Sequence, residues 1–129
     1  MRIGLFIPCY IDQFYPQVAV ATLELLEKLG CRVDYPAGQT CCGQPLANSG
    51  AEAVASGLYR HFVQLFQSCD YIVAPSGSCA YHVRKHFDII EQTETVQHVR
   101  KSTLDLSEFL VDVLKIEYLD SRFPYRVGL

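Results

Sequence analysis

Short apolar runs alternate along this chain with longer segments of helical periodicity. Three runs, residues 2–8, 31–35 and 71–74, are strand-like. Residues 16–29 and 49–68 repeat apolar side chains every three or four positions, which predicts two amphipathic helices. Strands that alternate with helices are typical of a parallel sheet with right-handed crossovers. We therefore predict an α/β fold, a Rossmann-like parallel sheet with helices on both faces, in a single domain.

The ends of these helices carry recognisable signals. Pro16 suits the first turn of the first helix and Gly30 its end. Ser49 and Glu52 have the spacing of a capping box at the start of the second helix. The residues expected to face the core in the first helix are Val18, Ala21, Thr22, Leu25, Leu26 and Leu29. Those expected in the second are Val54, Leu58, Phe62, Leu65 and Phe66.

The remaining segments are less regular. Residues 9–15 and 36–50 are predicted loops, and the turn at residues 75–78 leads into a helix near Cys79. Residues 89–100 are polar and support no prediction. Asp105 and Glu108 form another cap pattern, which opens a helix. Its expected core residues are Leu106, Phe109, Leu110, Val113 and Leu114. The segment 116–129 has no strong period and is interpreted as a linker or the start of a second domain.

Composition excludes several classes of protein. Of the 129 residues, 50% are apolar and 19% charged, so the chain is neither disordered nor fibrous. A net charge of -3 without a basic stripe gives no reason to expect nucleic acid or an anionic membrane surface as partner. No apolar run reaches the roughly 18 residues of a membrane span, and residues 3–8 are too short for a signal peptide core. We expect a cytoplasmic protein.

Six cysteines in a reducing compartment indicate metal binding or redox chemistry more than a disulfide framework. Cys9 follows the first predicted strand, Cys41 and Cys42 lie in the loop after the second, and Cys79 ends the turn after the third. Loops that leave the carboxyl ends of parallel strands open on the same edge of the sheet. The topology therefore predicts four thiols on one rim.

Cys31 and Cys69 provide an internal control. Each lies between a helix end and the start of the next strand, which places it at the opposite edge of the sheet. We interpret both as structural residues.

The rim cysteines favour a soft metal. Thiolates prefer zinc, copper(I) or iron–sulfur clusters, and Cys79 at a helix N-terminus would be favoured as thiolate. The side chains of adjacent cysteines diverge, so Cys41 and Cys42 suit different atoms of a multinuclear cluster better than one ion. Zinc remains the alternative metal, and a buried cysteine can also be a small apolar side chain.

These residues resemble a known family. Thirty-one residues separate Cys9 from Cys41, and thirty-six separate Cys42 from Cys79. With Gly43, this pattern is similar to the cysteine-rich CCG domain found in heterodisulfide reductase and in the iron–sulfur subunits of glycolate and lactate oxidation. Segments 25–33, 41–45 with 48–50, and 75–79 resemble the lactate-utilisation type most. The resemblance extends from Arg2 to about Leu114.

The resemblance implies a function. It implies an iron–sulfur electron-transfer subunit of an L-lactate (2-hydroxy acid) oxidising complex, with a cluster of 4Fe-4S type held by Cys9, Cys41, Cys42 and Cys79. Other subunits of a lactate or glycolate oxidation complex would be its partners. As a hypothesis from the residues, Gly43, Gln44 and Asn48 surround and brace the cysteine loop; ordinary turn residues are the equal alternative.

Two departures from the family pattern matter. The family often ends the pattern with Cys-x-x-Cys, but here the last position is His82, which is either a ligand or an ordinary helix histidine. Members usually carry two Cys-Cys-Gly motifs, and this chain has one. We interpret residues 1–129 as the first half of a two-domain protein, whose second CCG domain is missing. The cofactor can then be absent from the isolated half.

Two other functions stay open. The chain shows no acid/base pair or nucleophilic constellation, so catalysis by this chain itself is not predicted. A disulfide-reducing subunit, as in heterodisulfide reduction, is the nearest alternative. The other is a zinc-bound or metal-free interaction module that docks partner subunits.

Overall fold

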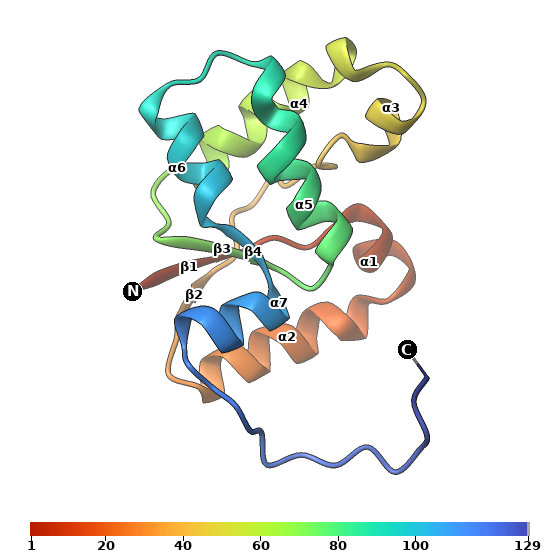
Figure 1. Cartoon of the computed structure of the whole chain (residues 1–129), viewed down its shortest axis with the longest axis vertical. Helices are drawn as coiled ribbons and strands as arrows, with labels where there is room; N and C mark the ends of the chain where they lie inside the picture. Colours follow the sequence, from red (N-terminus) through yellow and green to blue (C-terminus); the bar gives the residue numbers. More distant parts are fainter. Residues whose placement is uncertain (129) are drawn as a thin grey trace.

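The computed structural model describes residues 1–128, apart from the side chain of Glu52. Four parallel strands form one sheet in the order β2-β1-β3-β4 (Figure 1). They are β1 (Arg2–Leu5), β2 (Arg32–Asp34), β3 (Tyr71–Ala74) and β4 (Thr103–Asp105). In the register, Ile3 lies opposite Val33 on one side and Tyr71 on the other.

Helices cover both faces of the sheet. Their bounds are α1 (Cys9–Phe14), α2 (Pro16–Lys28), α3 (Gln44–Asn48), α4 (Glu52–Phe66), α5 (Gly77–His86), α6 (Glu94–Ser102) and α7 (Leu106–Glu108). A 3-10 turn (Phe87–Ile89) follows α5, and a π-helical turn (Phe109–Val113) continues α7. In Figure 1, α3, α4, α5 and α6 lie on one side of the strands and α2 and α7 on the other. The predicted α/β fold with a parallel sheet is confirmed.

The sheet separates two apolar cores. On the α4 side, the Phe6 ring packs edge-on against Phe62, with centroids 4.9 Å apart. On the α2 side, Leu26, Val73 and Phe109 are fully buried together. Strand residues alternate between the two cores because successive side chains point to opposite faces.

The predicted helices are present, with corrections to their faces. Helix α2 ends before Gly30, whose φ of 85° is the left-handed stop that the sequence predicts. Ala21 is nevertheless exposed. In α4 the expected core residue Val54 is 73% exposed, and the fully buried positions include Ala55 and Tyr59. Phe62 and Phe66 are buried as predicted, so the predicted face is wrong only in the first half of the helix.

The Ser49 cap prediction is wrong. The N-cap of α4 is Ala51, and the Ser49 hydroxyl donates instead to the Leu46 carbonyl. The other half of the predicted box, the Glu52 side chain, lies outside the described residues. Ser49 is the C-cap of α3, so the chain turns at residues 49–51 before α4 starts.

The loop predictions for residues 9–15 and 36–50 also need correction. Helix α1 occupies most of the first segment, where the backbone N–H groups of Ile11 and Asp12 donate to the Pro8 carbonyl. Short helix α3 lies in the second. Strand β4 and helix α6 were not predicted, because their sequences are mostly polar and their few apolar residues give only a weak signal. Tertiary contacts form them: Val99 and Thr103 are fully buried.

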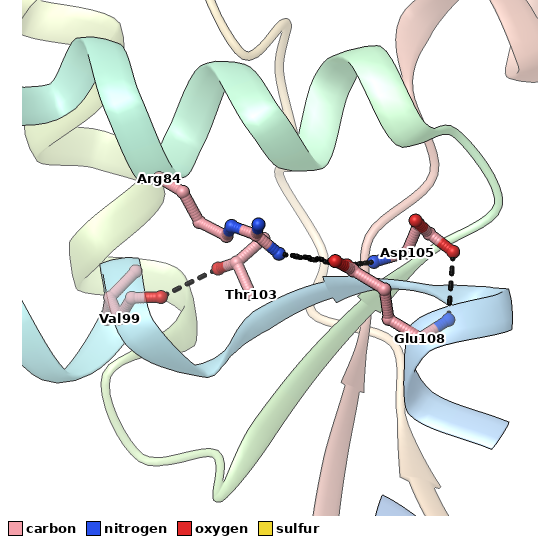
Figure 2. Close-up of polar contacts among 5 residues, drawn as sticks. All are labelled: Arg84, Val99, Thr103, Asp105 and Glu108. Atoms are coloured by element: carbon pink, nitrogen blue, oxygen red, sulfur yellow. Dashed lines mark hydrogen bonds and ion pairs between the residues drawn. The ribbon is translucent and has the colours of Figure 1, made fainter. Parts of the chain in front are cut away.

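The second capping box is confirmed. The Glu108 N–H donates to the Asp105 carboxylate, and the Asp105 N–H donates to the Glu108 carboxylate, both at 3.1 Å. Figure 2 shows that Arg84 of α5 also reaches Glu108, at 2.9 Å. The Thr103 hydroxyl donates to the Val99 carbonyl at 2.7 Å. These contacts join edge strand β4 to α5, α6 and α7.

Within residues 1–128, no helix is both long enough and apolar enough to cross a bilayer.

Candidate metal centre

The carboxyl edge of the sheet brings together the four cysteines predicted for the site. Cys9 begins α1 shortly after β1, and Cys41 and Cys42 lie in the loop after β2. Cys79 lies in the first turn of α5, after β3. Each loop leaves a different strand, and the parallel topology delivers them to the same rim.

The four thiols form two pairs. The Sγ atoms of Cys9 and Cys41 are 3.8 Å apart. The Cys42 thiol hydrogen-bonds the Cys79 sulfur, and a charge on Cys79 also acts on Cys9. Cys9 is exposed, whereas Cys42 and Cys79 are buried. The adjacent residues Cys41 and Cys42 therefore face different partners, as the sequence argument expected of neighbouring side chains.

Gln39 fixes the start of the cysteine loop. Its side-chain amide donates to the Leu5 carbonyl at 2.7 Å and accepts from the Ile7 N–H at 3.1 Å. These bonds tie the loop to the chain leaving β1 and hold Cys41 beside Cys9.

Gly43 fixes the other end of this loop. Its φ of 92° is a left-handed conformation, and an added Cβ would lie 2.6 Å from the Tyr59 ring. The Gly43 N–H points to the Cys41 sulfur at 3.4 Å. A glycine is needed here for its φ and for its lack of a side chain.

The buried thiols differ in acidity. The hydrogen bond from Cys42, helped by the hydroxyls of Ser76 and Ser78, lowers the pKa of Cys79 to about 6 against the opposing effect of burial. The same bond from Cys42, together with burial, raises the pKa of Cys42. Burial and the neighbouring Cys41 thiol raise the pKa of Cys9. The inner pair thus combines a thiolate at Cys79 with a thiol at Cys42.

The predicted bracing residues have different surroundings. The Gln44 side-chain oxygen lies 3.7 Å from the Cys79 sulfur. Gly43 holds the loop as described above. Asn48 is exposed at the end of α3, away from the contacts described for the cysteines.

His82 lies one turn after Cys79 and is only 2% exposed. Its Nε2 is 2.9 Å from the Tyr59 hydroxyl, and its ring stacks on His86 with centroids 4.7 Å apart. Tyr59 is also the ring that contacts Gly43. This histidine is part of the packing beneath the cysteine loop.

Cys31 and Cys69 lie at the other edge of the sheet. Cys31 directly precedes β2, whose first residue pairs with Arg2 at the start of β1. Cys69 directly precedes Asp70, whose N–H donates to the Arg2 carbonyl at 2.8 Å. The Cys69 sulfur also packs beside Gly4, where an added Cβ would lie 2.7 Å away. The structure thus separates the cysteines four against two, as the topology predicted.

The chemistry of the rim residues fits an iron–sulfur type of group. The donors are four sulfurs, and backbone and amide groups lie next to them. The 3.8 Å between Cys9 and Cys41 equals the separation of about 3.8 Å that two thiolates have on one tetrahedral metal ion. Over residues 1–128, however, no three His, Cys, Asp or Glu side chains form a group that could hold one metal ion. Two separated pairs suit a multinuclear group better than a single ion.

Four residues contribute to the site without a role predicted from the sequence: Gln39, Tyr10, Ser76 and Ser78. The Tyr10 hydroxyl donates to Ser76 at 2.9 Å, and Ser76 lies 3.4 Å from Ser78. A signal existed for the serines, since they flank the glycine at the start of the Cys79 helix. Tyr10 and Gln39 carry no local signal because their partners are distant in sequence.

Comparison with known proteins gives a consistent result. The sequence model of the cysteine-rich domain CCG matches residues 3–84. Lactate utilization protein A from Geobacillus kaustophilus is 45% identical over 121 residues, which cover 91% of this chain and 51% of the relative. The protein of the same name from Geobacillus thermodenitrificans is 42% identical over 130 residues, 98% of this chain and 54% of the relative.

The chain spans about half the length of these curated relatives. No solved structure matches it.

Proposed function

The chain belongs to the cysteine-rich CCG domain family, and we propose that it is an iron–sulfur electron-transfer subunit of an L-lactate (2-hydroxy acid) oxidising complex. The observation that carries the proposal is the convergence of Cys9, Cys41, Cys42 and Cys79 at one edge of the sheet. The relatives named Lactate utilization protein A support the choice of substrate.

In this proposal the four cysteines hold the group and their surroundings tune it. A bound iron–sulfur cluster would supply reversible one-electron chemistry. The Gly43 N–H donates toward the Cys41 sulfur, which stabilises negative charge there. Ser76 and Ser78 do the same at Cys79. The side of the site formed by Cys42 and Cys79 is buried and excludes water. Cys9 is exposed, so electrons would pass to a partner from the side of the site where Cys9 lies.

We propose further that residues 1–129 form the first of two CCG domains. Residues 116–128 contain no helix or strand and are mostly exposed, as expected of a linker. A second domain would complete the cofactor site, and the other subunits of a lactate or glycolate oxidation complex would exchange electrons with it. The reducing cytoplasm, where thiols stay available for metal, is the compartment that this role requires.

Anaerobic reconstitution with iron and sulfide tests the proposal, both on this chain and on the same chain joined to the second half of a relative. We expect bound iron, acid-labile sulfide and broad visible absorption. Cys42→Ser should remove most of the loaded iron because Cys42 belongs to the inner thiol pair. Cys31→Ser is the matched control at the opposite edge and should load normally. Equal loss in both variants, or stoichiometric zinc alone, would contradict the proposal; the zinc result favours the interaction module.

One observation supports a second candidate, a disulfide-reducing subunit. Cys9 is exposed and its sulfur lies near that of Cys41, while Cys79 is held as a thiolate. Such thiols could exchange with a disulfide substrate. Turnover of a disulfide that depends on Cys41 or Cys42, without lactate-dependent reduction, would favour this function.

A further inference from the structure

A basic cavity of about 540 Å³ lies between α5 and α6. The residues that line it are Arg84, Lys85, Gln92, Gln97, Arg100 and Lys101. Four of the six are cationic, two are amides, and none is a carboxylate. The chain as a whole carries a net charge of -3, whereas the lining of this cavity is positively charged. It is at the opposite end of α5 from Cys79.

Arg100 is held in a fixed position by neutral acceptors. Its Nε and Nη2 donate to the Arg84 carbonyl at 3.1 and 2.8 Å, and its Nη1 donates to the Gln92 side-chain oxygen at 2.6 Å. Gln92 is itself anchored, because its amide donates to the Phe87 and Ile90 carbonyls. None of these acceptors carries a charge. The guanidinium is therefore positioned while its positive charge stays uncompensated.

The other cations differ in how far they are neutralised. Arg84 pairs with Glu108 at 2.9 Å, so its charge is largely balanced. Lys85 and Lys101 are exposed and make no ion pair with the described part of the chain. Three uncompensated cations thus surround the cavity: Lys85, Arg100 and Lys101.

Basic residues in the last turn of a helix also balance the helix dipole, and both α5 and α6 end this way. That role needs neither a cavity nor a braced guanidinium. An arginine fixed by neutral partners keeps its positive charge at a defined place, and this charge attracts phosphate and carboxylate oxygens. The volume lies in the range of small-molecule sites.

We propose that this cavity binds a small anion with two or more negative charges, of the phosphate- or carboxylate-bearing class. Arg100 makes the directed contact, and Lys85 and Lys101 supply the surrounding positive charge. The site is independent of the cysteine rim and of the function proposed for it.

Isothermal titration of the metal-free chain at constant ionic strength tests the site, with pyrophosphate as one probe and tricarballylate as the other. We expect saturable one-to-one binding of at least one probe. Binding of pyrophosphate alone assigns a phosphate-bearing ligand, and binding of tricarballylate alone a carboxylate-bearing one. Saturable binding of neither probe overturns the proposal.

Variants separate a built site from general charge attraction. The double variant Lys85→Gln with Lys101→Gln should weaken binding about tenfold, since each lost charge-assisted contact costs a several-fold factor. The matched control, Lys28→Gln with Arg122→Gln, removes the same charge from exposed positions elsewhere and should bind normally. Equal weakening in both double variants overturns the site.

Arg100→Gln should abolish saturable binding. Arg100→Lys should restore it only in part, because a lysine keeps the charge but not the bonds to Arg84 and Gln92 that fix its position. Circular dichroism checks that both variants fold. If Arg100→Gln unfolds, the lysine double variant and its control decide the question. Full binding by a folded Arg100→Gln overturns the directed contact.

Discussion

Gly43 combines two demands on one residue at the cysteine loop. Its backbone is left-handed, which costs side-chain-bearing residues about 1–2 kcal/mol. Its Cα faces the Tyr59 ring so closely that even a methyl group would overlap it. The glycine of the Cys-Cys-Gly sequence is therefore required by geometry. It lets the loop pack directly against Tyr59 of α4, and in this position Cys42 faces Cys79.

Gly43→Ala should destabilise the fold by about 2–5 kcal/mol, the sum of backbone strain and overpacking. Urea denaturation gives the free energy of unfolding. Gly50→Ala is the control, since Gly50 has a φ of 84° but nothing within 4 Å of an added Cβ. It should cost only about 1–2 kcal/mol. Equal losses for the two substitutions would show that the Tyr59 contact contributes nothing.

Among the elements, the junction of β4 and α7 depends on charge. Partial burial would raise the pKa of Glu108, but hydrogen bonds from Arg84 and from the Asp105 backbone outweigh it and hold that pKa below the ordinary 4.5. A carboxyl group with a lowered pKa stabilises the fold fully above its unfolded pKa. That stabilisation is lost as the pH falls through the lowered folded pKa.

Glu108→Gln should therefore cost about 1 kcal/mol at pH 7, a modest value because the side chain is a third exposed. The difference from wild type should begin to shrink as the pH falls below 4.5, and should reach zero only below the lowered folded pKa, where the native carboxyl group is also protonated. Urea denaturation at several pH values measures this. Glu117→Gln removes an exposed carboxylate in the tail and should leave the free energy of unfolding unchanged at pH 7. A pH-independent cost for Glu108→Gln would refute the role of the ion pair.

Elements with a strong apolar period were predictable and those without one were not. The strand at residues 71–74 and the helix from Pro16 follow the sequence closely, because their apolar side chains fill the core. Strand β4 was missed because it is short and polar, and it exists through pairing with β3. The predicted face of α4 held at Phe62 and Phe66 but not at the start of the helix, where the small residue Ala55, and not Val54, meets the loop at Gly43.

Across the entire fold, one sheet holds two cores together. Each core lies on one face, and strand β3 contributes side chains to both: Ile72 and Ala74 to the core on the α4 side, and Val73 to the core on the α2 side. Residues so coupled unfold as one unit, so the chain should behave as a single cooperative domain.

Ile11→Val and Ile90→Val test this cooperativity. Ile11 is buried in the core on the α2 side and Ile90 in the core on the α4 side. Each substitution should lower the free energy of unfolding by about 0.5–1.5 kcal/mol. The double variant should lower it by the sum of the two single effects, within about 0.5 kcal/mol. Thermal unfolding followed by far- and near-ultraviolet circular dichroism should give one shared transition in every variant. Two separate transitions, each shifted by only one of the substitutions, would mean that the two cores unfold independently.

The cysteine sorting was predictable because it follows from topology alone. Parallel strands send every outgoing loop to one edge and every incoming loop to the other, whatever the side chains. The pairing within the rim was not predictable. Cys9 faces Cys41, and Cys42 faces Cys79, because Gln39 and Gly43 fix the loop between them.

Apolar periodicity and chain order were enough to define the class of fold, the main helices and strands, and which thiols share an edge, because both are local properties of the sequence. The edge strand β4, the partner of each thiol, the burial of His82 against Tyr59, and the basic cavity emerge only from the folded chain. Each of these depends on contacts between residues far apart in the chain, whose distances and solvent exposure no local pattern encodes.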